Sequence, residues 1–183
     1  DPAAEARVVP GAAVALVISL GPPFNAGELC AALDNCDLTW SSSGAAVWAR
    51  QTDATREGGS VAQSGIVARL EETTLTTTAT GPGRLVFDWK VNTSTYDRLE
   101  FFANGTSRDS ISGMTDWIEK TYYLGPGIQE LRWTFRWSSG AGPNRGWVDH
   151  VRWEPASEAT LCEALDNCDL TWTSSGTGGA VWF

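Results

Sequence analysis

Three stretches of the chain alternate bulky apolar residues with polar ones at a period of two. They run over 85–91, 131–137 and 147–153, and each gathers its aromatic side chains on one face. This period is typical of antiparallel strands that bury one face. Shorter or weaker patterns predict further strands over 38–40, 46–50, 65–69, 73–79, 97–103, 107–112 and 117–123.

Turn residues separate these predicted strands, and helix is expected at one turn, about 27–34, and at its repeat over 158–165. The turn sequences are Gly81-Pro82-Gly83, Asn104-Gly105 and Gly125-Pro126-Gly127. Glycine supplies a positive φ and proline fixes its own φ, so both favour turns. Many strands without intervening helices predict an all-β fold, an antiparallel β-sandwich or jelly roll.

One apolar segment near the start of the chain, 13–20, stands apart from this pattern. Val14, Leu16, Ile18 and Leu20 form one bulky face, and smaller residues form the other. No earlier strand can pair with it locally. We therefore expect an extra N-terminal strand that inserts into a groove of a neighbouring copy, because donated strands use alternate side chains in this way. The alternative is that it closes its own domain.

The chain contains an internal repeat. The segment 29–40 returns almost unchanged at 161–172, and both copies carry Leu-Asp-Asn-Cys-Asp-Leu-Thr-Trp. We expect an N-terminal extension over 1–27, one module over 28–160, and a partial copy of the module's opening segment over 161–183. An isolated opening segment cannot bury its own apolar face. Leu170 and Trp172 are therefore expected to dock on a neighbour, or to start a further tandem copy.

The four cysteines occur as two pairs with the same spacing, Cys30 with Cys36 and Cys162 with Cys168. An even number in a chain of this kind indicates disulfides and an oxidising compartment. Pairing within each pair is the simplest connectivity, and pairing of Cys30 with Cys162 stays open. Four free thiols are a weaker alternative, and zinc is weaker still because the usual short spacing is missing.

Charge and composition exclude several classes of function. The net charge is −9, from 13 basic and 22 acidic residues, with one histidine. An acidic surface repels phosphate backbones, which argues against nucleic-acid binding. No apolar stretch reaches the roughly 18 residues of a membrane span.

Catalysis has little support in the sequence. His150 follows Asp149, but strand neighbours face opposite sides, so no Ser-His-Asp arrangement is indicated. A glycosidase needs two carboxylates facing each other. Nothing in the sequence places two in that way among Glu71, Glu72, Asp88, Asp97, Glu100 and Asp116. We expect no enzyme activity.

Asp149 is expected on the apolar face of its strand, with Trp147, Val151 and Trp153. A carboxylate there needs a partner. Ca²⁺ is one candidate, because it takes carboxylate and backbone oxygens. The favoured alternative is a structural aspartate that accepts loop N–H groups or pairs with an arginine. No other cofactor is expected.

Aromatic side chains supply a candidate sugar-binding surface. Trp117, Trp137 and Trp153, with Tyr122 and Tyr123, could stack on pyranose rings. The favoured alternative is that most of the ten tryptophans fill the core of the sandwich.

Several motifs between Leu29 and Trp153 carry a family resemblance. They include Phe87-Asp88-Trp89-Lys90-Val91, Asp116-Trp117 and Gly146-Trp147-Val148-Asp149-His150-Val151. With them, the chain resembles jelly-roll modules related to MAM and carbohydrate-binding modules, found in tandem in large secreted bacterial proteins. The resemblance implies an extracellular adhesive or structural role, and a related acid in such folds can help bind calcium. Residues 8–23 separately resemble the last strand of a PASTA-like repeat.

These observations favour a secreted or cell-surface structural module that joins copies of itself into a filament or repeat array by strand donation. The alternative is a carbohydrate-binding or adhesin module, with polysaccharide as the partner.

Overall fold

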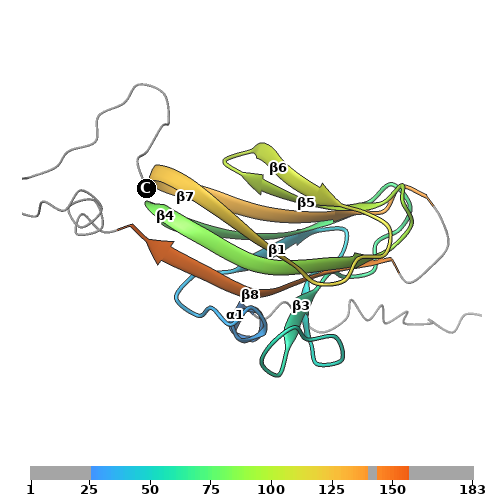
Figure 1. Cartoon of the computed structure of the whole chain (residues 1–183). Coiled ribbons are helices and arrows are strands. Elements are labelled where there is room, and N and C mark those ends of the chain that lie inside the picture. Colours follow the sequence, from blue (N-terminus) through green and yellow to red (C-terminus); the bar gives the residue numbers. More distant parts are fainter. Residues whose placement is uncertain (1–25, 140–143, 157–183) are drawn as a thin grey trace, which may run out of the picture.

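The computed structural model describes residues 26–139 and 144–156, and these are almost entirely β-structure (Figure 1). The one helix among these residues, α1, confirms the helix predicted near 27–34, and its predicted repeat at 158–165 lies outside the described residues. The elements are α1 (Ala26–Ala32), β1 (Ser41–Gly44), β2 (Ala49–Gln51), β3 (Val61–Gln63), β4 (Glu72–Asn92), β5 (Arg98–Ala103), β6 (Thr106–Ile111), β7 (Ile118–Arg136) and β8 (Arg145–Pro155).

The strands form one hydrogen-bonded network in which β4 and β7 are central. The order is β2-β3-β8-β4-β7-β5-β6, and β1 pairs with the free side of β4. All pairings are antiparallel, as predicted. The strand β4 pairs with β7 from Glu72↔Arg136 to Trp89↔Ile118, almost its whole length.

A shared bend in β4 and β7 turns this network into two layers. Gly81 lies opposite Gly127, and the register shifts between Gly81 and Gly83. A Cβ on Gly81 would lie only 2.1 Å from the carbonyl oxygen of Gly125, so only glycine fits. Predicting turns at the two Gly-Pro-Gly sequences was therefore wrong. Because they occur at the same level of two paired strands, both strands bend together while the ladder continues.

The two layers have different outer faces. We call one of them the open layer: it contains β6, β5, the second half of β7, the first half of β4, and β1. We call the other the covered layer: it contains the first half of β7, the second half of β4, β8, β3 and β2. Figure 1 shows α1 and β3 beside β8, on the side of the molecule away from β5 and β6. The result is the predicted antiparallel β-sandwich.

Aromatic rings join the two layers in the core. Phe87 of the covered layer contacts Phe101 and Trp133 of the open layer, with ring centroids 5.0 and 5.1 Å apart. Trp40, Trp48, Trp89 and Trp133 are all buried. These four tryptophans fill the core.

The segment after α1 is fixed to β8. Cys30 and Cys36 form a disulfide, the local pairing predicted as simplest. The N–H of Val151 donates to the carbonyl of Leu33 at 2.9 Å, and the side-chain amide of Asn35 donates to the carbonyl of Val151 at 3.1 Å. Leu29 and Leu33 are buried beneath this segment.

The short strands differ most from the prediction. Residues 65–69 form no strand; the pairing with β8 is made instead by β3, a few residues earlier. The hairpin turn at Asn104-Gly105 is confirmed, with φ of 52° and 73°. Asparagine and glycine both tolerate this left-handed region, as a two-residue hairpin requires.

Several sequence predictions lie outside the described residues. The donor strand with Val14, Leu16, Ile18 and Leu20, the second cysteine pair Cys162 and Cys168, and the repeated Leu170 and Trp172 stay predictions. Within the described ranges, no helix is long and apolar enough to cross a membrane.

Candidate functional site

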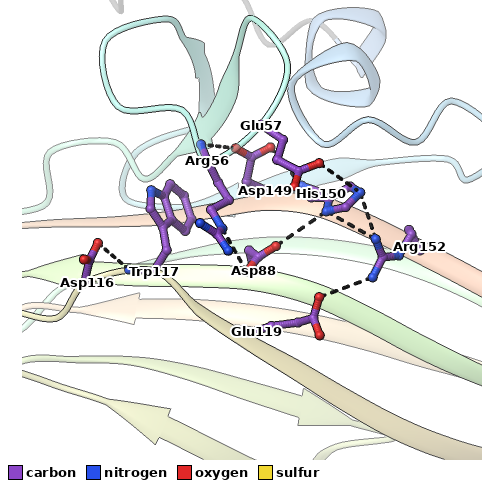
Figure 2. Close-up of polar contacts among 9 residues, drawn as sticks. All are labelled: Arg56, Glu57, Asp88, Asp116, Trp117, Glu119, Asp149, His150 and Arg152. Carbon is purple, nitrogen blue, oxygen red and sulfur yellow. Dashed lines mark hydrogen bonds and ion pairs between the residues drawn. The ribbon is translucent and has the colours of Figure 1, made fainter.

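A β-bulge in β8 shapes the outer face of the covered layer. Val86 pairs with Arg152 and Asp88 pairs with Asp149, so the register shifts between these pairs, and His150 has a φ of 48°. A bulge adds a residue to one strand and re-aims its side chains. Asp149 and His150 therefore both lie beside Asp88 (Figure 2). This corrects the prediction that they face opposite sides.

Asp149 holds the loop that follows β2. Its carboxylate is fully buried and accepts hydrogen bonds from the N–H of Arg56 at 2.7 Å and of His150 at 2.8 Å. Burial raises the pKa of the Asp149 carboxyl, and the N–H groups of Arg56, His150 and Glu57 oppose that rise. Within the described ranges, no group of three or more metal-ligating side chains is arranged around an ion site.

A polar chain continues from Asp88 across this face (Figure 2). His150 Nδ1 lies 3.5 Å from Asp88 Oδ2, and Arg152 Nη1 lies 2.9 Å from His150 Nε2. His150 Nε2 also lies 3.7 Å from Glu57 Oε2, so the ring is placed between carboxylates and a guanidinium. Arg152 also contacts Glu119 at 3.3 Å. These contacts tie β4, β7 and β8 together.

The three tryptophans of the predicted sugar-binding surface do not form one continuous surface. Trp137 and Trp153 pack against the core. Trp117 lies beside Lys90, whose Nζ is 5.0 Å from the ring centres of both Trp117 and Trp147. The three predicted rings therefore have different packing roles, and Trp117 with Trp147 is the aromatic pair of the covered layer.

Tyr122 also packs inward, between the layers. It stacks on Phe87 and donates to Asp109 at 3.3 Å. Burial and the Asp109 carboxylate raise the pKa of Tyr122 to about 12. Tyr123, on the opposite side of the strand, is 59 % exposed.

The predicted carboxylates are distributed over the molecule. Glu71 and Asp116 accept nearby backbone N–H groups, Asp97 lies buried in a loop, and Asp88 belongs to the covered layer. Glu72 and Glu100 both line a hollow on the outer face of the open layer.

This hollow is a shallow groove of about 190 Å³ across β4, β7 and β5. Its walls come from three cross-strand rows: Glu72, Arg136 and Arg98; then Thr74, Thr134 and Glu100; then Thr76, Arg132 and Phe102. Arg132 Cζ lies 4.3 Å from the centre of the Phe102 ring. We refer to the residues lining it as the arginine groove: Glu72, Arg98, Glu100, Phe102, Arg132, Thr134 and Arg136.

The three arginines of the groove were not among the predicted site residues. A signal for two of them was present, because Arg132 and Arg136 alternate with the buried Leu131, Trp133 and Phe135. That alternation shows they point outward. It does not show that β5 brings Arg98 beside Arg136.

Comparisons with known proteins find similarity at the level of structure. No protein-family model and no curated protein sequence matches this chain. The secreted serine protease VesC of Vibrio cholerae is 19% identical over 60% of this chain and 24% of its own, with a TM-score of 0.49. The carbohydrate-binding module TmCBM61, solved with β-1,4-galactotriose, is 11% identical over 64% of this chain and 88% of its own, with a TM-score of 0.46.

An adhesin domain is also similar, the K1 cleaved adhesin domain of Lys-gingipain from Porphyromonas gingivalis. It is 15% identical over 64% of this chain and 91% of its own, with a TM-score of 0.48. All three TM-scores are below 0.5.

Proposed function

We propose that this chain is a non-catalytic carbohydrate-binding module of a secreted or cell-surface protein, and that its ligand lies in the arginine groove. The observation that carries the proposal is the groove's wall of donors and acceptors on an otherwise open sheet face. Arginine only donates hydrogen bonds, an ionised glutamate only accepts, and threonine does both. Sugar hydroxyls also do both, so such a wall can match them at several positions.

The size of the groove favours a polymer over a small molecule. Pockets that enclose drug-sized ligands measure about 300–1,000 Å³, whereas this groove measures about 190 Å³. It crosses three strands and is open to solvent, so it suits one or two units of a chain that continues on either side. The Cys30–Cys36 disulfide supports an oxidising, extracellular setting.

Affinity gel electrophoresis against a panel of soluble polysaccharides tests the proposal. We expect retardation by at least one polysaccharide, with no release of reducing ends on long incubation. Thr134→Tyr fills the middle of the groove and should abolish retardation. Thr121→Tyr, the same change at an exposed position of β7 in the covered layer, should leave it intact.

Two results would contradict the proposal. Binding that survives Thr134→Tyr but is lost in Trp117→Ala would move the site to the aromatic pair of the covered layer. Release of reducing ends would show that the module is catalytic.

A further inference from the structure

The arginine groove holds three arginines against two glutamates, so it carries a small excess of positive charge on an acidic protein. Arg98 and Arg136 are direct cross-strand partners. Like charges in this position destabilise a sheet. Elsewhere, Arg84 pairs with Glu154, Lys120 with Asp109 and Arg152 with Glu119. Within the described part of the chain, Arg98, Arg132 and Arg136 make no ion pair, although Glu72 and Glu100 line the same groove.

One of these guanidinium groups is held in place. Arg132 lies over the Phe102 ring, and its Nε is buried without a hydrogen-bond partner among the described residues. The groove thus combines one oriented guanidinium, Arg132, with two more on a cross-strand pair that lies beyond the row of Thr134 and Glu100.

We propose that the arginine groove recognises a uronate unit of an acidic polysaccharide. The planar fork of arginine matches a carboxylate with two parallel hydrogen bonds. Arg98 and Arg136 are placed to take the carboxylate, while Glu100 and Thr134 accept from and donate to ring hydroxyls. This inference rests on the proposed carbohydrate-binding function and specifies its ligand class.

The charge of the whole chain opposes non-specific binding of this ligand class. With a net charge of −9 the protein repels polyanions in general, polygalacturonate included, so the affinity has to come from contacts inside the groove. Two glutamates in the groove add local repulsion against a densely sulfated chain. A ligand with one carboxylate per sugar and free hydroxyls can pair its carboxylate with the arginines and donate hydrogen bonds from its hydroxyls to the glutamates.

The test is isothermal titration calorimetry of the full chain with polygalacturonate and with its carboxyl-reduced, neutral form. We expect binding of polygalacturonate only. Arg98→Gln or Arg136→Gln should each weaken it by about tenfold or more, since hydrogen bonds to charged groups contribute roughly that much. Arg98→Lys keeps the charge but loses the fork, and should recover only part of the affinity.

The matched control is Arg84→Gln, which removes an exposed, ion-paired arginine outside the groove and should bind like the native chain. Near-ultraviolet circular dichroism of each variant checks that it folds. If a glutamine variant does not fold, the binding of the Arg98→Lys variant still tests the proposal. Equal binding of the reduced polymer would overturn the uronate assignment and leave the proposed function standing. Tighter binding of dextran sulfate than of polygalacturonate would also overturn the uronate assignment and leave the proposed function standing. Failure to bind any polysaccharide would overturn both.

Discussion

Asp97 links two loops at one end of the sandwich. Its Oδ1 accepts the N–H groups of Ser138 and Ser139 at 2.6 and 3.0 Å, and its Oδ2 accepts the hydroxyls of Thr93 and Ser94, both at 2.7 Å. The side chain is fully buried. One carboxylate thus connects the loop after β4 with the segment that follows β7.

The ionisation of Asp97 should therefore stabilise the fold. Burial opposes ionisation, but hydrogen bonds from Ser139, Ser94, Thr93 and Ser138 outweigh it and hold the pKa of Asp97 below its usual value. A lowered folded pKa means that the stabilisation is present above the unfolded value of about 3.9 and is lost as the pH falls through the lower folded value.

We predict that Asp97→Asn lowers the free energy of unfolding at pH 7 by about 1–3 kcal/mol, because an amide cannot accept all four bonds. The difference from the native chain should shrink below about pH 4. Urea unfolding followed by tryptophan fluorescence at pH 7 and pH 3 measures both. Asp53→Asn, at an exposed loop position, is the control. Equal loss of stability at both pH values would contradict the electrostatic explanation.

The residue Asp149 shows what sequence reasoning can and cannot supply at this scale. A buried carboxylate on a strand had to find partners, and the sequence analysis anticipated loop N–H groups among the candidates. It could not identify them, since one donor, Arg56, lies far away in the chain. The bulge at His150 was also invisible, because a period-two pattern does not register one inserted residue.

At the scale of elements, the bulge of β8 and the segment after α1 complete each other. A bulge leaves backbone groups outside the ladder, and such groups need partners when they are buried. Leu33 accepts the N–H of Val151, and Asn35 donates to its carbonyl. Asn35 Oδ1 also accepts the N–H groups of Asp37 and Leu38.

We predict that Asn35→Ala destabilises the module by about 1–3 kcal/mol, because it leaves the half-buried carbonyl of Val151 without its donor. Asp37→Ala removes an exposed side chain two residues later and should have little effect. Midpoints of urea unfolding for both variants test this. The same midpoint in the two variants would mean that Asn35 does not anchor the segment.

Element boundaries were harder to predict than element type. A Gly-Pro-Gly sequence has the same local chemistry in a turn and in a bend, and only the paired strand distinguishes them. Period-two alternation gives the outward residues of a strand but not its neighbour. The row of Glu72, Arg136 and Arg98 depends on which strands pair. The groove could therefore not be predicted, although the alternation showed that Arg132, Thr134 and Arg136 face outward.

At the scale of the whole molecule, the contacts that join the two layers include a complete core among the described residues between 26 and 156. The aromatic core, the Cys30–Cys36 disulfide and the pairing of β8 with β4 all lie inside this range. We predict that a chain of residues 26–156 unfolds cooperatively with the same urea midpoint as residues 1–183. Chains 1–156 and 26–183 separate the contributions of the two ends. A large drop in the midpoint would show that a terminal segment is part of the fold.

The bend shared by β4 and β7 has a consequence for how this module holds what it binds. Two separate sheets are joined only by side chains, and they can shift relative to each other while each keeps its own ladder. Here the main-chain hydrogen bonds of two strands run from one layer into the other. Any rotation between the layers would break them. A partner on one outer face and a partner on the opposite face would therefore be kept at a constant angle, which makes the module a stiff spacer between them.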